Sequence, residues 1–266
     1  MSELRQVEEP GDADDRIRIR ALAYDYPPGA RLPVHFHDWA QLIFAVRGVM
    51  SVHTEAGAWV VPAQRAVWVP ANVRHRIDMS GAVAMRTLYF SPALESFGPG
   101  ECTVLNVAPL LRELILHAVE RAPLRADRPA EGRVIGMILD QLQELPAAPL
   151  AVPAPRDPRA RRAADWLRRN PADGASLERI ARRAGASKRT LERLFQRETG
   201  MSFGAWRQQV RLMQALELLA AGEPVTSVAL AVGYESPSAF IARFREVLGT
   251  TPGRYYAELH RAAEAD

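Results

Sequence analysis

The pattern of apolar and polar positions divides the chain into a strand-rich part and a helix-rich part. Between about residues 17 and 90, short runs rich in Val, Ile, Trp and Phe are separated by Gly and Pro, which is typical of β-strands bounded by turns. Several short strands at close, regular spacing favour a small barrel or a sandwich. The runs are residues 35–48, 50–54, 58–62, 66–70 and 84–90.

Two amphipathic helices are expected directly after these strands, because the apolar period changes from two to between three and four. They span residues 107–122 and 129–145. Helices of this kind pack on the barrel or pair with a second subunit, so they are the predicted contact of a homodimer. Their apolar stripes consist of Leu110, Leu111, Leu114, Ile115 and Val119 in the first helix and Val134, Ile135, Ile138, Leu139 and Leu142 in the second.

A stretch rich in Pro and Ala, residues 146–157, is predicted to be a semi-rigid extended linker, because proline at this density cannot sustain a helix. The charge also changes there. Residues 1–155 hold 15 Arg and 18 Asp plus Glu, net −3, whereas residues 156–266 hold 19 Lys plus Arg and 13 Asp plus Glu, net +6. We therefore predict an α+β two-domain protein, with a small β-barrel and flanking helices in 1–145 and an all-α domain in 158–262. The basic second half indicates a polyanionic partner, usually nucleic acid.

The helical part contains an internal duplication. The segment SLERIARRAGASKRTLERLFQRETGMSF from Ser176 and the segment PVTSVALAVGYESPSAFIARFREVLGTTP from Pro224 match at an offset of 48 residues, which becomes 49 after the turn. In each copy a short apolar helix is followed by a glycine suited to positive φ, a serine suited to cap a helix, and a second amphipathic helix. This is the form of a helix-turn-helix motif. These glycines and serines are Gly185 and Ser187 in the first copy and Gly233 and Ser236 in the second.

The second helix of each motif is the predicted DNA-reading element, because a helix-turn-helix places that helix in the major groove. Arginine binds guanine there and glutamate accepts from cytosine, so the first copy is rich in base-reading groups. The second copy is poor in them, and we expect from it more contact with phosphate or DNA shape. The alternative, a basic face that is only solvated, fits the duplication less well. The DNA-binding candidates are Ser187, Lys188, Arg189, Glu192 and Arg193 in the first copy and Ser236, Ser238, Ala239, Ile241 and Arg243 in the second.

The strand-rich part carries a histidine cluster. His35 and His37 are two residues apart on a predicted strand, so both point to one face with Gln41, and a hairpin return brings His75 beside them. Three imidazoles and one oxygen ligand suit Zn, Fe, Ni or Mn, although a neutral amide is a poorer ligand than a carboxylate and cannot act as a general base. Three interpretations stay open: a divalent transition-metal site of these four residues, a metal-free effector pocket, or polar members of a barrel mouth. Trp68 is a further effector-binding candidate, as a wall for an aromatic ligand.

Several classes of protein are excluded by composition. No apolar run approaches the roughly 18 residues of a membrane span, and the acidic N-terminus lacks the apolar core of a signal peptide. Cys102 is the only cysteine, so no intramolecular disulfide forms. These features favour a cytoplasmic protein without a membrane partner.

Residues 158–258 resemble the DNA-binding domain of the AraC/XylS family of transcription regulators. The markers are the first copy above, then RLMQALELL, then the second copy with A-x-x-x-G-Y-x-S and F-x-x-x-x-G-x-x-P-x-x-Y, the family's most specific signature. The resemblance implies double-stranded DNA and RNA polymerase as partners. Members often carry a polar or basic residue where this chain has Ala242. The base-reading positions implied are Arg189, Glu192 and Arg193 in the first motif and Ser238, Ala239 and Ile241 in the second.

The first half resembles the cupin-like effector domain that this family often carries. The resemblance implies a regulator controlled by a small-molecule or metal effector, more often an activator, acting on a neighbouring transporter or metabolic gene. A metal-dependent cupin enzyme, of oxygenase or isomerase type and fused to a DNA-binding module, is the alternative. Gln41 stands where cupins have Glu, which counts against catalysis, so we predict a non-enzyme. The matching positions are Gly29, His35, His37, Gln41 and Gly48 in the first cupin motif and Pro70, Asn72 and His75 in the second.

Overall fold

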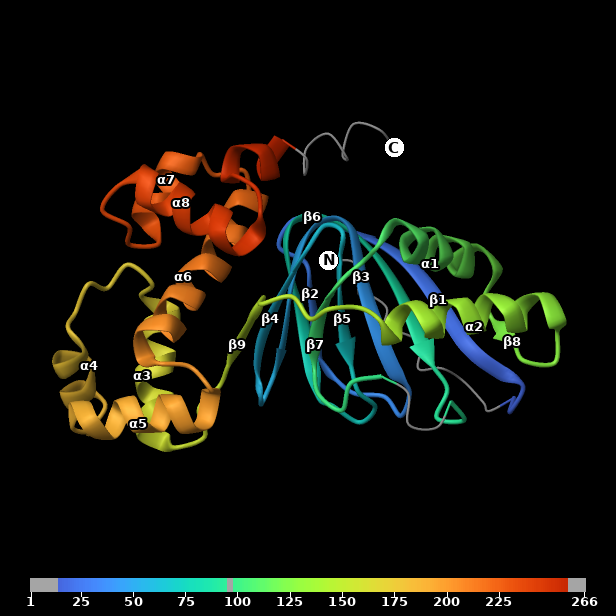
Figure 1. Ribbon diagram of the computed structural model, residues 1–266, viewed down its shortest axis with the longest axis horizontal. Coiled ribbons are helices and arrows are strands. Elements are labelled where there is room, and N and C mark those ends of the chain that lie inside the picture. The colour runs from blue at the N-terminus through green and yellow to red at the C-terminus, as the bar shows by residue number, and fades with distance from the viewer. Residues whose placement is uncertain (1–13, 95–97, 258–266) are drawn as a thin grey trace.

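The computed structural model describes residues 14–94 and 98–257, so residues 1–13, 95–97 and 258–262 of the predicted domains lie outside the described residues. An antiparallel sheet curls around an apolar interior, helices α1 and α2 cover one of its sides, and the remaining helices form a second body (Figure 1). The protein is therefore mixed α+β with two parts, as predicted. The strands are β1 Ile17–Tyr26, β2 Arg31–His35, β3 Ala40–Thr54, β4 Gly57–Pro62, β5 Arg65–Val69, β6 His75–Phe90, β7 Thr103–Asn106, β8 Leu124–Arg125 and β9 Ala151–Pro153.

The two long strands β3 and β6 organise the sheet. β3 pairs with β5 along its first part, with β4 along its second part and with β6 along both. A register shift on either side of Arg47, next to Gly48 at φ +82°, bends β3 between these two parts. A Cβ at Gly48 would lie 2.2 Å from the Ala82 carbonyl oxygen, so only glycine fits this bend.

The two faces of the sheet bury different side chains because strand residues alternate. Ile43 faces the interior of the barrel, whereas its neighbours Leu42 and Phe44 pack under α1, Pro109–Arg121, and α2, Pro129–Gln143. The two predicted helices are confirmed, and their apolar stripes lie on the sheet except for Leu110, which is 48% exposed.

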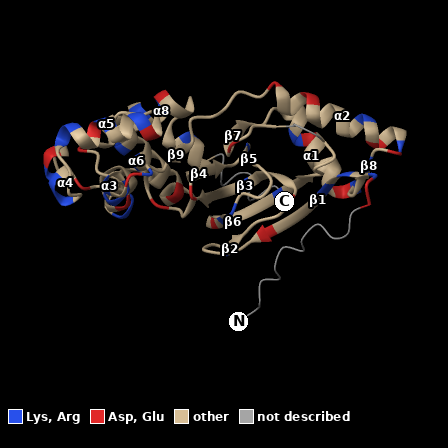
Figure 2. Ribbon diagram, turned by 90° about the horizontal axis from the view of Figure 1, so that it is seen from below, with Lys and Arg blue, Asp and Glu red and all other residues tan. Residues whose placement is uncertain are grey.

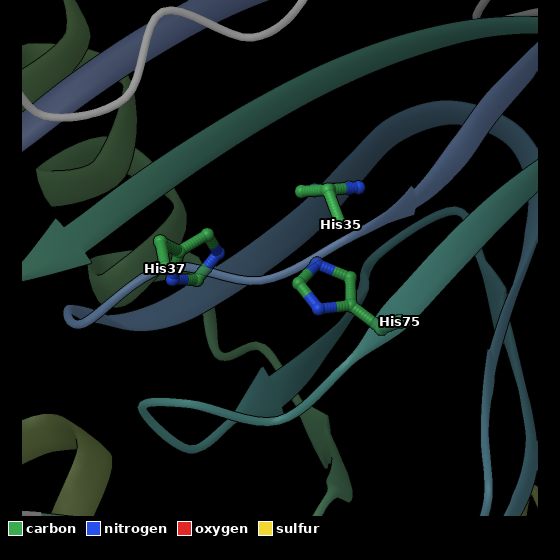
Figure 3. Close-up of side chains that lie close together, drawn as sticks. All are labelled: His35, His37 and His75. Carbon is green, nitrogen blue, oxygen red and sulfur yellow. The ribbon is translucent and has the colours of Figure 1, made fainter.

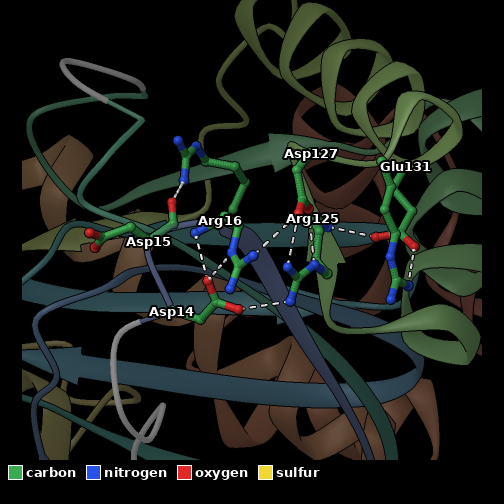
Figure 4. Close-up of polar contacts among 8 residues, drawn as sticks. Asp14, Asp15, Arg16, Arg125, Asp127 and Glu131 are labelled. Atoms are coloured by element: carbon green, nitrogen blue, oxygen red, sulfur yellow. Dashed lines mark hydrogen bonds and ion pairs between the residues drawn. The ribbon is translucent and has the colours of Figure 1, made fainter.

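An exposed polar network fixes the end of this sheet to α2. The Arg125 guanidinium lies 2.7 Å from Asp14 and 2.9 Å from Asp127, and the Arg125 amide donates to Glu131 in the first turn of α2 (Figure 4). Single ion pairs near the surface stabilise little, but the contact of Arg125 with Asp14 joins two segments that are 111 residues apart in sequence.

The second body contains both predicted helix-turn-helix motifs. The turns carry Gly185 at φ +74° and Gly233 at φ +85°, as expected. Ser187 and Ser236 cap the following helices, accepting from the amides of Thr190 and Ala239. The motifs are α4–α5 and α7–α8, and α6 joins them (Figure 1). The helices are α3 Pro158–Arg169, α4 Leu177–Arg183, α5 Lys188–Thr199, α6 Phe203–Ala220, α7 Val225–Ala231 and α8 Pro237–Leu248.

The Pro- and Ala-rich segment is extended, and it also belongs to the sheet. Its strand β9 pairs with the edge of β4, and Leu150 is only 1% exposed. The edge of β4 offers backbone groups to any extended segment that passes it, and Leu150 and Val152 gain burial by docking there. The segment therefore fastens the helical body to the barrel.

Helix α6 lies directly against the outer face of the barrel. Its Trp206 indole donates to the Pro153 carbonyl at 2.8 Å, and the Ser51 hydroxyl donates to the Glu217 carboxylate. Burial, with Asp78 nearby, raises the pKa of Glu217. At the end of the helix, a Cβ on Gly81 would lie 2.4 Å from the Ala220 carbonyl oxygen.

The contact at Gly81 can be tested by adding one methyl group. Gly81→Ala should destabilise the protein through both its left-handed backbone, φ +73°, and the clash with Ala220. Gly29→Ala is the matched control, because Gly29 has φ +76° and nothing within 4 Å of the added atom. We expect the control to lose about 1–2 kcal/mol of unfolding free energy, from backbone strain alone, and Gly81→Ala to lose about 1–3 kcal/mol more. Urea unfolding measures both losses. Equal losses would mean that α6 does not press on Gly81.

A pH dependence follows from the buried Glu217. The Glu217 carboxyl holds its proton more tightly in the folded protein than in the unfolded chain, where its pKa has the usual value of 4.5. Stability is therefore lost as the pH rises through the raised pKa of the folded state. Glu217→Gln cannot ionise but can still accept from Ser51. The variant should melt at a higher temperature than the wild type at pH 8, and the difference should vanish near pH 4. A difference that stays constant between pH 4 and 8 would contradict this origin.

Candidate effector site and DNA-binding face

The three predicted histidines converge at one end of the barrel (Figure 3). His35 ends β2 and His75 begins β6, and the two are direct partners in the register, with ring centroids 4.3 Å apart. His37 was predicted on the same strand as His35, and this is wrong. The chain leaves β2 after His35 and turns before β3, and the Asn72 amide donates to the His37 carbonyl and holds the turn.

Hydrogen bonds to the backbone fix the tautomer of each ring. The Nδ1 atoms of His35 and His75 lie 2.8 Å from the carbonyls of Pro33 and Val73, and Nδ1 of His37 bonds the Trp39 carbonyl. A carbonyl only accepts, so each proton is on Nδ1 and each Nε2 presents a lone pair. This is the arrangement in which metal-binding histidines are usually held.

These lone pairs point into a buried space. Nε2 of His35 and of His75 are buried without a hydrogen-bond partner in residues 14–94 and 98–257. The three histidines offer ligand atoms that all lie within 4.8 Å of one another. Burial lowers the pKa of His37 and brings that of His75 to about 4, so both rings are neutral near pH 7, as metal binding requires.

Gln41, the second residue of β3, completes the group. The Thr87 hydroxyl donates to the Leu42 carbonyl at 3.1 Å, so it accepts from the Gln41 amide nitrogen at 2.9 Å. That bond turns the Gln41 amide oxygen toward Nε2 of His37, 3.0 Å away.

With the proton of His37 on Nδ1, two hydrogen-bond acceptors face each other, an arrangement that a positive charge stabilises. A proton on His37 is opposed by the burial of the ring. A metal ion would satisfy both atoms, because two ligands at about 2.1 Å from an ion lie about 3.0 Å apart at right angles and about 3.4 Å apart in a tetrahedral site. Three imidazoles and one amide oxygen fit a divalent transition metal.

Trp68 does not join this group. It pairs with Leu42 on β3, so its side chain lies on the face under α1 and α2, opposite to that of Gln41. Its indole donates to the Pro99 carbonyl at 2.9 Å and packs on Phe90. Tyr89, which the sequence reading missed, takes the place beside the histidines, with its ring edge-on to His37 at 5.1 Å. Tyr89 is paired directly with Gln41 in the sheet, so a correct register between β3 and β6 would have predicted its position.

The helical body presents the predicted DNA-binding side chains. Lys and Arg are densest on α3, α4 and α5 (Figure 2). Lys188, Arg189, Glu192 and Arg193 are exposed on α5, where Lys188 is paired with Glu178 at 2.7 Å. Arg193 has no ion-pair partner in the described ranges. On α8, Ser238, Ala239 and Ile241 are exposed, and Arg243 is paired with Glu246.

Both parts match known domains. Residues 19–124 match the model of the AraC-like ligand binding domain, and residues 180–258 match a helix-turn-helix domain. The HTH-type transcriptional regulator NimR of Escherichia coli is 37% identical over 252 residues, which cover 94% of this chain and 92% of that protein. The chain belongs to the AraC family of transcription regulators.

Two further similarities to this AraC-family chain cover less than half of it. The HTH-type transcriptional regulator RipA of Corynebacterium glutamicum is 42% identical over 111 residues, 42% of this chain and 32% of that protein. A crystal structure of an AraC-type transcriptional regulator from Chromobacterium violaceum is 27% identical, with a TM-score of 0.37, and covers 41% of this chain and 96% of that one. Within the described ranges, no helix has the length and apolar character needed to span a membrane.

Arg193 should read a base in the AraC-family chain. Arg193→Ala should weaken binding to a specific DNA site by about 1–3 kcal/mol and relax specificity at one base pair, measured by fluorescence anisotropy with single-base variants of the site. Arg133→Ala, an exposed arginine on α2, is the matched control and should leave binding unchanged. A uniform loss over all DNA sequences would assign Arg193 to a phosphate instead.

Proposed function

We propose that this AraC-family regulator binds a divalent transition metal, or an effector together with that metal, at His35, His37, His75 and Gln41. The opposed acceptors of His37 and Gln41, 3.0 Å apart, carry the proposal. A bound ion would attract both lone pairs and draw the connection after β2 toward β3. The residues would supply binding and shape, and the metal would supply positive charge for an anionic or chelating effector.

The barrel and the DNA-binding body are joined through β3. Gln41 stands at one end of β3, and Ser51, which holds Glu217 of α6, stands near the other. An effector controls DNA binding only if it binds the DNA-competent and incompetent arrangements differently. A shift of β3 on binding would reach α6, and with it both helix-turn-helix motifs.

Two further partners belong to this proposal. Leu110 on α1 and Met137 on α2 are 48% and 44% exposed, which suits a homodimer contact over these helices. A regulator of this family would act on RNA polymerase at a neighbouring transporter or metabolic gene. The proposal places the protein in the cytoplasm, where its DNA is.

The alternative function, a cupin enzyme, has less support. The family is one of transcription regulators, which are generally not enzymes, and the position where cupins carry Glu holds a neutral amide that cannot act as a base.

Metal content tests the site directly. After loading with Zn²⁺ and dialysis, the wild type should retain about one ion per chain, and His37→Ala should lose it. His117→Ala, which changes an exposed histidine on α1, is the control and should keep the ion. Gln41→Glu should bind more tightly, because a carboxylate is the better ligand. Wild-type protein without metal after loading would leave the histidines as hydrogen-bonding groups of an organic-effector pocket.

A further inference from the structure

The two DNA-reading helices have the same frame but present different chemistry. Both are capped by serine and end at a left-handed glycine, Gly200 at φ +71° and Gly249 at φ +73°. The offset of 49 residues that aligns their buried positions also aligns their exposed ones. The corresponding exposed pairs are Arg189 with Ser238, Glu192 with Ile241, and Arg193 with Ala242.

The first turns of α8 carry no group that reads a base edge bidentately. Residues 237–242 are Pro, Ser, Ala, Phe, Ile and Ala, without a charged or amide side chain. The nearest arginine, Arg243, is held by Glu246 at 2.8 Å. Ile241 is 36% exposed at the position that Glu192 occupies in the other motif.

The only apolar group that base pairs display in the major groove is the C5-methyl of thymine. We infer that α8 reads thymine through this methyl group, with Ile241 as the contact and Ala239 and Ala242 beside it. The second motif is then selective for T·A pairs by apolar contact, instead of depending on phosphate and DNA shape alone. The inference rests on the DNA-binding function and adds the class of base that is read.

The experiment replaces thymine by deoxyuracil, which differs only in lacking the methyl. A specific site is first selected from random DNA with the full-length protein. Loss of specificity in Arg193→Ala identifies the half-site of α5, and the half-site of α8 lies about 34 Å, one helical turn, away. Each thymine of both half-sites is then replaced singly, and the dissociation constant is measured.

We expect one or two replacements in the α8 half-site to weaken binding about fourfold each, the value for burying one methyl group. Ile241→Ala should weaken binding to the thymine site by a similar factor and should no longer distinguish thymine from deoxyuracil. Ile241→Val should keep most of the distinction. Arg193→Ala should distinguish thymine from deoxyuracil in the α8 half-site as well as the wild type does. Because Ile241 is exposed, the Ile241 variants should melt like the wild type.

Two results would overturn the inference: equal binding of wild type to every deoxyuracil site, or a deoxyuracil penalty that persists in Ile241→Ala. Either result would leave DNA binding itself intact. A selection that enriches no sequence would instead refute the DNA-binding function, so the two failures are distinguishable.

Discussion

The register of β6 is the constraint on which the rest of the structure depends. Its first residue, His75, is paired with His35, and near its other end Tyr89 is paired with Gln41. Between them, Gly81 lets α6 approach closely. A slip of one residue would move every side chain of β6 to the opposite face, which would separate the histidines and bury polar groups against the helices. One strand therefore positions the histidine cluster, the core and the contact with the helical body.

The proposed effector site is defined by the hydrogen-bond donors that it lacks. Each ring nitrogen that carries a proton donates it to a backbone carbonyl, and Thr87 uses the amide hydrogen of Gln41. What remains in the centre are lone pairs, and buried acceptors without a donor are costly. Unpaired buried acceptors are expected at a site that binds a cation, whereas in a closely packed structural core they would be paired with donors.

The DNA-binding body illustrates how one frame can serve two chemistries. Capping, turns and buried aromatic or aliphatic positions repeat between the motifs because they determine the fold of each motif. The exposed positions are free of that requirement: Arg189, Glu192 and Arg193 on α5 are charged, whereas the corresponding residues on α8 are uncharged. The rigid α6 between them fixes their separation but not what each one recognises.

The sequence by itself determined those features that depend on local chemistry and period. The left-handed conformation of Asn72, the serine caps and the turn glycines all follow from the intrinsic preferences of single residues. Helix α1 and helix α2 follow from their apolar period, and the two helix-turn-helix motifs from the repeat.

Tertiary structure decided what depends on pairing between distant segments. The turn after His35 was missed because His-x-His also suits a continuous strand, and only the β2–β6 pairing shows where β2 ends. Trp68 was placed at the site because it is near in sequence, but the face of a strand residue is set by its partners, here Leu42. The docking of β9 and α6 depends on contacts between distant segments. Trp206 and Pro153, for example, are more than 50 residues apart in sequence, and no local pattern encodes their contact.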